Sequence, residues 1–142
     1  MDTENTYKNF NEDKSIEELQ YHMLLNKVKL NELKTDFQFY TALLEASIYK
    51  PNIINLFEKL QYFKNNIDII KKEASNLLIE VQSQINHISK KIECEDVACD
   101  SFFITNYELL QRKILEFLTK VYNDKRQMFE YLRSVIITKK RY

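Results

Sequence analysis

The 142-residue sequence contains no glycine, no tryptophan and only one proline, Pro51. Glycine ordinarily makes up about 7% of a protein. Tight turns, phosphate-binding loops and left-handed helix ends use it because it lacks a Cβ atom. Its absence excludes the glycine-rich phosphate loop and the G-x-S-x-G nucleophile elbow. The composition therefore disfavours a many-turned α/β enzyme and favours a few long helices.

Potential metal ligands and nucleophiles are also scarce. The only histidines are His22 and His87, and the only cysteines, Cys94 and Cys99, are separated by four residues. Structural zinc usually needs four ligands in short paired spacings, and two cysteines do not make the disulfide framework of a small secreted protein. We therefore predict no metal site, no cofactor, no small-molecule substrate and no catalytic residue, so that the protein is not an enzyme.

The charge balance is neutral, because 21 Lys and Arg offset 21 Asp and Glu. This balance gives no general attraction to nucleic acid or to an anionic membrane, so nucleic acid is a disfavoured partner. No apolar run reaches the roughly 18 residues of a transmembrane helix, and the N-terminus lacks the pattern of a secretory signal. We expect a cytoplasmic protein without a transmembrane segment, with association with the cytoskeleton or a nuclear location as further possibilities.

Apolar residues recur in steps of three and four through most of the chain, which places them on one face of an α-helix. The longest such stretch runs from Ile53 to Ile92. We predict an all-α fold, an elongated bundle or coiled coil of three long helices. The predicted divisions are a flexible polar tail at residues 1–14, one helical domain at 15–138 and a basic tail at 139–142. Within the domain, the predicted elements are helices at 15–49, 51–92 and 102–138 and an acidic loop at 93–101.

Two segments interrupt the helical pattern. Pro51 disfavours helical geometry at Lys50 and suits the first turn of a new helix. A full reversal of the chain is favoured there over a kink, because two wide apolar stripes would otherwise lack partners within the chain. Residues 93–101 contain four acidic side chains and a serine, which are typical of turns and helix caps.

The first predicted helix contains a regular heptad pattern with two polar members, Asn26 and Ser47. A buried asparagine in such a seam can fix the register and the number of partner helices, because its amide must find a hydrogen-bond partner. The alternative is a position near solvent in an irregular bundle. The last predicted helix contains two adjacent apolar stripes, one through Phe103 and Val135 and the other through Leu115 and Ile136.

These stripes are wider than three helices of one chain need, and large exposed apolar patches usually mark interfaces. We therefore predict a non-catalytic coiled-coil subunit that assembles with other long-helix chains, as a hetero-oligomer rather than a homo-oligomer. A self-contained bundle is the competing interpretation. The predicted partner-binding residues are Met23, Asn26, Leu30, Leu33, Phe37, Tyr40, Leu118, Tyr122, Phe129 and Leu132. The predicted contacts to an anionic partner are Arg126, Arg133, Lys139, Lys140 and Arg141.

The first functional expectation is assembly in the cytoskeleton or in cell division, at the spindle, centrosome or kinetochore. The second is a vesicle-tethering complex in membrane traffic. The third is a small helical bundle that binds nucleic acid or modulates a host.

Overall fold

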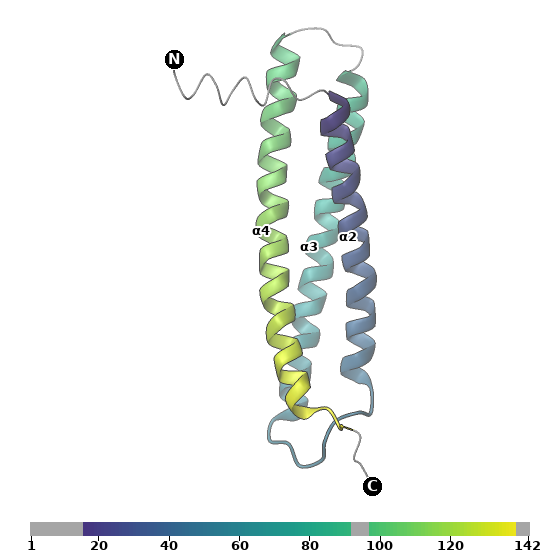
Figure 1. Ribbon diagram of the computed structural model, residues 1–142, viewed down its shortest axis with the longest axis vertical. Helices are drawn as coiled ribbons and strands as arrows, with labels where there is room; N and C mark the ends of the chain where they lie inside the picture. The colour runs from purple at the N-terminus through teal and green to yellow at the C-terminus, as the bar shows by residue number, and fades with distance from the viewer. Residues whose placement is uncertain (1–15, 92–96, 139–142) are drawn as a thin grey trace, which may run out of the picture.

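The computed structural model describes residues 16–91 and 97–138, with side chains described for 16–90 and 101–138. Three helices, α2 (Ile16–Glu45), α3 (Leu56–Lys91) and α4 (Val97–Val135), lie side by side along one long axis (Figure 1). The described residues form no strand, only one isolated backbone pairing. The predicted all-α, elongated three-helix bundle is therefore confirmed, whereas supercoiling of a coiled-coil type stays a prediction.

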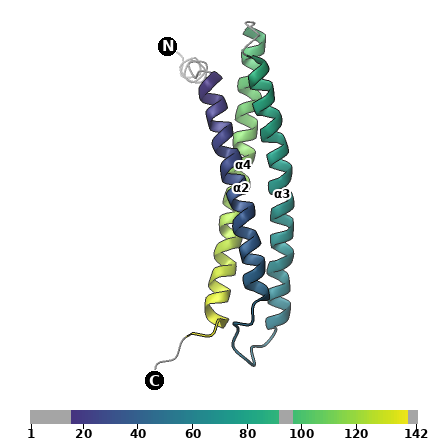
Figure 2. The same ribbon diagram turned by 90° about the vertical axis from the view of Figure 1, so that its right-hand side faces the viewer.

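The chain reverses between α2 and α3, as the sequence pattern favoured. Near one end of the bundle, Gln20 of α2 donates a hydrogen bond from Nε2 to Oγ of Ser89 on α3, at 3.3 Å. Near the other end, Lys64 Nζ lies 3.4 Å from Glu45 Oε1. Both contacts require α2 and α3 to run antiparallel, and Figure 2 shows the two helices along each other over most of their length.

The core consists of one apolar stripe from each helix, at the steps of three and four residues that the sequence predicts. Burial of these side chains removes apolar surface from water at about 25 cal/mol per Å². The stripe of α2 is Leu19, Met23, Leu30, Leu33, Phe37 and Leu44. The stripe of α3 is Phe63, Ile67, Ile70, Ala74, Leu77, Val81, Ile85 and Ile88. The stripe of α4 is Phe103, Tyr107, Leu110, Ile114, Phe117, Val121, Met128, Leu132 and Val135.

The connection between α2 and α3 is longer than predicted. The first helix ends at Glu45 rather than at residue 49, and the second begins at Leu56 rather than at residue 51. Asn52 and Asn55 have φ values of 65° and 59°, in the left-handed region that a continuing α-helix cannot contain. Asparagine tolerates this conformation better than most residues, so in this glycine-free chain it makes the turn.

The same connection pairs with the end of α4, and this pairing sets two helix ends. Lys50 donates its backbone N–H to the carbonyl oxygen of Val135, and Ile137 donates to that of Ile48, both at 2.8 Å. The Tyr49 hydroxyl also donates to the Leu43 carbonyl oxygen at 2.6 Å, near the end of α2. The third helix consequently ends at Val135, three residues before the predicted residue 138.

The third helix also begins earlier than predicted, at Val97 instead of residue 102. Residues 97–101 of the predicted acidic loop are therefore helical. Connections between neighbouring helices in a bundle commonly need only two to eight residues. Part of the predicted acidic loop can therefore be helical. The predicted tails at 1–14 and 139–142, and residues 92–96, lie outside the described residues.

Three partly buried tyrosines should make the free energy of unfolding depend on pH. Burial raises the pKa of Tyr40, Tyr49 and Tyr131 above 10.0, and the carboxylate of Asp36 contributes at Tyr40. The folded chain thus holds these phenol protons more tightly than the unfolded chain does. The free energy of unfolding should be at its full value below about pH 10 and should decrease as the pH rises above it.

Urea unfolding at several pH values between about 8 and 11 tests this expectation. Tyr131→Phe removes one of the three titrating groups. The Tyr131 hydroxyl is buried and has no hydrogen-bond partner among the described residues. The variant should therefore lose less stability than the wild type over this range. Equal losses in the two proteins would contradict the assignment of the alkaline effect to Tyr131.

Candidate functional site

The three helix pairs are not equally close. Helix α3 packs closely against both α2 and α4, whereas α2 and α4 approach each other at few positions. Ion pairs also join α3 to α4, at 2.9 Å between Lys113 and Glu80 and at 3.2 Å between Lys120 and Glu73. The seam between α2 and α4 is thus the most open side of the bundle.

A chain of hydrogen bonds crosses this seam near the start of α2. Asn26 Nδ2 donates to Gln111 Oε1 at 2.6 Å, and Gln111 Nε2 donates to the Tyr107 hydroxyl at 3.1 Å. The same hydroxyl lies 2.7 Å from His22 Nδ1. Asn26 is buried, with 6% of its surface exposed. Its amide therefore fixes the register of α2 against α4 within the chain. A role in setting the number of partner helices stays a prediction.

Aromatic rings close the seam at its other end. Tyr40 of α2 meets Phe129 of α4 edge to face, with ring centroids 5.2 Å apart. Phe37 packs on Tyr40 in the same manner at 5.0 Å. Lys125 Nζ lies 6.0 Å from the centre of the Phe129 ring, within the range of a cation–π contact. The seam is therefore polar at one end and aromatic at the other.

An apolar row on α4, which we call the α4 ridge, lies along this open side. It consists of Leu115, Leu118, Tyr122 and Phe129, at heptad-compatible spacing. Leu115 is 66% exposed, Tyr122 61% and Phe129 40%, while Leu118 is half-buried. On the α2 side of the seam, the exposed Leu25 lines a hollow of about 250 Å³. The ridge has the spacing of a helix-packing surface, but the helices of the described chain cover it only in part, at Leu118 and Phe129.

The structure divides the ten predicted partner-binding residues into two groups. Tyr40 and Leu118 are half-buried and Tyr122 and Phe129 are exposed, so these four lie at the open seam. The others are covered by helices of the same chain and belong to its own core. This buried group is Met23, Asn26, Leu30, Leu33, Phe37 and Leu132. The six buried residues show that the heptad pattern identifies positions of helix packing within the chain. Binding of a partner at the other four stays a prediction.

Leu115 is the ridge residue that the predicted set omitted. Its place seven residues before Tyr122 and fourteen before Phe129 is the signal that identifies it. Among the predicted contacts to an anionic partner, Arg126 and Arg133 are exposed next to the ridge. Lys139, Lys140 and Arg141 lie outside the described residues.

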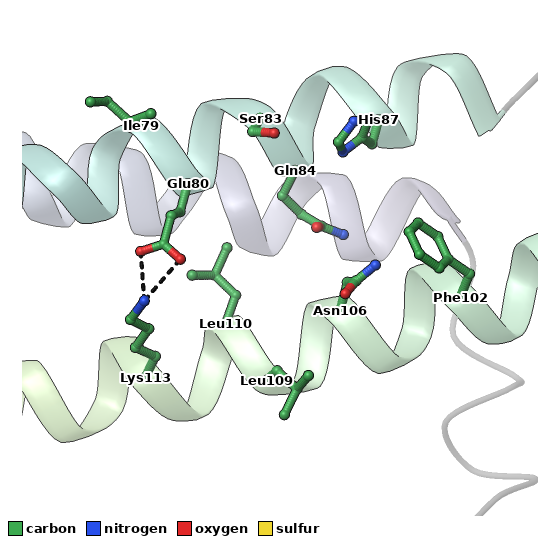
Figure 3. A pocket seen from close by; sticks show the side chains of 10 residues that line it. All are labelled: Ile79, Glu80, Ser83, Gln84, His87, Phe102, Asn106, Leu109, Leu110 and Lys113. Carbon is green, nitrogen blue, oxygen red and sulfur yellow. Dashed lines mark hydrogen bonds and ion pairs between the residues drawn. The ribbon is translucent and has the colours of Figure 1, made fainter.

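A second hollow lies between α3 and α4, at the end of the bundle near His87 and Phe102 (Figure 3). Its volume is about 550 Å³, and exposed Ile79, Phe102 and Leu109 contribute apolar walls. Figure 3 shows Gln84 pointing from α3 toward α4, beside Asn106. Gln84 is only 6% exposed, and its Nε2 has no hydrogen-bond partner among the described residues. This hollow therefore contains an unsatisfied buried amide.

The polar groups of this hollow do not form a catalytic constellation. Ser83 and His87 both line it, but no hydrogen bond joins them, and a nucleophile is usually activated by a base within hydrogen-bond reach. Glu80 is paired with Lys113. In the part of the chain that the structure describes, no group of three or more His, Cys, Asp or Glu is placed to hold a metal ion.

The fold and the open seam thus define a class, a three-helix bundle with one incompletely covered packing face. No family model, no curated protein and no solved structure matches the chain. Within residues 16–91 and 97–138, no helix has the length and hydropathy that a bilayer crossing requires.

Proposed function

We propose that this protein is a non-catalytic helical subunit that binds a helix of another protein chain along the α4 ridge. The observation that supports this proposal is the exposure of three apolar side chains at seven-residue intervals, Leu115, Tyr122 and Phe129. Single exposed apolar residues are common on protein surfaces. A row at heptad spacing beside a partly open seam is the arrangement into which a further helix packs its own apolar stripe.

The position of the ridge also favours a helical partner over an extended one. The ridge and α2 are the two walls of a long, straight seam, which matches an amphipathic helix lying in a groove. Polar contacts at one end and the Tyr40–Phe129 pair at the other hold these walls in place without a bound partner. A partner helix would therefore find a largely preformed site, which reduces the entropic cost of binding.

Paired substitutions on two faces test the proposal. Leu115→Ser/Tyr122→Ser removes the two most exposed side chains of the ridge, and Ile79→Ser/Leu109→Ser removes similar exposed apolar surface at the α3–α4 hollow. The partner that co-purifies in stoichiometric amount from the native source would be identified, produced separately and titrated against each variant by calorimetry. The ridge variant should bind about 30-fold more weakly, since truncation of interface hot spots costs about 2 kcal/mol or more.

The control variant should bind within about twofold of the wild type. Both variants should keep the wild-type unfolding free energy within about 0.5 kcal/mol, because all four side chains are exposed. Equal affinity of the wild type and the ridge variant for the identified partner would contradict the proposal. A monomeric protein that co-purifies with no partner would contradict it as well.

Nucleic-acid binding is the second candidate function, supported by the exposure of Tyr122 and Phe129. Exposed rings next to basic side chains can stack on unpaired bases, and Lys125 and Arg126 lie beside these two rings. A single-stranded oligonucleotide whose retention falls steeply with salt, and is lost in Tyr122→Ser, would support this function. We rank it second because the formal net charge of the chain is zero.

The cellular process remains a prediction from the sequence. For a helix-binding subunit, assembly in the cytoskeleton or in cell division stays the first proposed process, and vesicle tethering is the alternative process. Identification of the stoichiometric partner in the experiment above distinguishes them.

A further inference from the structure

The hollow between α3 and α4 contains a hydrogen-bond donor that the described chain does not satisfy. Gln84 is only 6% exposed, and its Nε2 has no hydrogen-bond partner among the described residues. The half-buried Asn106 lies beside it on α4 (Figure 3), but Nε2 donates no hydrogen bond to this residue. A buried donor without a partner destabilises a fold. Its presence in this core therefore calls for a group that completes its hydrogen bonding.

The charges that line the hollow are already paired. Glu80 and Lys113 are the only acidic residue and the only lysine or arginine among its described lining residues. Lys113 Nζ lies 2.9 Å from both carboxylate oxygens of Glu80. A charged ligand would enter without a free counter-charge and would lose hydration that nothing replaces. The group that completes the Gln84 amide is therefore a neutral acceptor, such as a carbonyl oxygen.

An aromatic ring is exposed at one end of the hollow. Phe102 is 58% exposed, and the buried Phe103 holds it edge to face, with ring centroids 5.6 Å apart and planes at 81°. Figure 3 shows His87 of α3 at the same end, and the buried Leu110 also lines the hollow. Aromatic rings prefer offset-stacked or edge-to-face contacts with one another. This end therefore suits a planar aromatic group.

We infer that the hollow binds a neutral aromatic molecule that presents a carbonyl oxygen to Gln84 Nε2 and packs its ring on Phe102. Its volume of about 550 Å³ lies within the range of small-molecule sites. Nε2 is closed to solvent in the unbound chain. The ligand reaches it when the neighbouring Asn106 side chain turns aside, a change of rotamer that is common on binding. This site is separate from the α4 ridge, so the inference does not rest on helix binding there.

Three small probes separate the parts of this inference. Benzamide has the ring and a neutral carbonyl, benzoate has the same ring with a charged carboxylate, and cyclohexanecarboxamide has the amide without an aromatic ring. Amide resonances of the protein would be followed by two-dimensional NMR during titration with each. Benzamide should shift the resonances of residues 80–87 and 102–113 with a Kd of about 1–10 mM, as suits so small a ligand. Benzoate should bind at least tenfold more weakly and cyclohexanecarboxamide at least threefold more weakly.

Matched variants test the two named side chains. Gln84→Leu should weaken benzamide binding at least tenfold and should keep the chain folded, because it removes an unsatisfied buried donor. Gln82→Leu, two residues away and outside the lining of the hollow, should bind within about twofold of the wild type. Phe102→Ala should weaken binding at least fivefold. Phe39→Ala truncates a similarly exposed ring on α2 and should leave the affinity unchanged.

Several outcomes would overturn the inference. They are the absence of shifts at residues 80–87 and 102–113 with about 20 mM benzamide, equal binding of benzamide and benzoate, or an unchanged affinity in Gln84→Leu. Shifts confined to Leu115 and Tyr122 would overturn it as well, because they would place the probe on the ridge. None of these results alters the titration of the ridge variants with a helical partner, so the two proposals stand or fall separately.

Discussion

Leu30→Ala should lower the free energy of unfolding by about 2–5 kcal/mol, because it truncates a large side chain in the core of the bundle. Leu30 is completely buried in the core stripe of α2. Its truncation removes favourable apolar burial and leaves a cavity that packed neighbouring helices fill only in part. Equilibrium unfolding in urea, followed by far-ultraviolet circular dichroism, measures the loss.

Leu24→Ala is the matched control, because the same substitution is made on the same helix at a side chain that is 44% exposed. It should change the unfolding free energy by no more than about 0.5 kcal/mol. Similar losses in the two variants would mean that Leu30 does not pack in a tight intramolecular core. This comparison therefore tests directly whether the α2 stripe is filled by the chain itself rather than by a partner.

Gln84→Leu should raise the free energy of unfolding by about 1–3 kcal/mol, an increase where most substitutions cause a decrease. The Gln84 side chain is nine-tenths buried, and its Nε2 donor has no partner among the described residues. A buried donor that loses its hydrogen bonds to water destabilises the fold. Leucine has a similar size and removes this cost while adding apolar contacts between α3 and α4.

Gln82→Leu is the corresponding control two residues away on α3. Gln82 accepts a hydrogen bond from Lys27 Nζ at 2.8 Å and donates one to Asn86 Oδ1 at 3.0 Å. Its replacement should therefore lower the unfolding free energy, by about 0.5–1.5 kcal/mol. Destabilisation by Gln84→Leu as well would show that a group outside the described residues, such as a bound water molecule, satisfies the Gln84 amide in solution.

The predicted Gln84 effect also illustrates a limit of sequence patterns. Gln84 lies next to Ile85 in the stripe of α3, and its polarity alone indicates a solvent-facing position. Its burial results from the close packing of α3 against α4, which a pattern on one helix does not contain. The same holds for the Asn26–Gln111 hydrogen bond, whose two members are 85 residues apart in the chain.

Helix ends show a similar division between local and tertiary causes. The absence of glycine correctly indicated few turns, and Pro51 correctly located the reversal between α2 and α3. The exact extent of that connection depends on the backbone pairing of Tyr49 with Ile136, which joins the first connection to the end of the last helix. No local signal at either residue predicts a contact across such a separation.

The sequence by itself determined the class of fold, because steps of three and four between apolar residues are a local property of each helix. The same steps selected the side chains of the core stripes. Only the tertiary structure decided which apolar faces the chain covers with its own helices and which it leaves open. Met23 and Tyr122 belong to equally regular stripes, yet the first is fully buried and the second is 61% exposed. The physical reason is geometric: each helix carries apolar surface around a wide arc, and only the arrangement of three helices determines which part of the arc faces a neighbour.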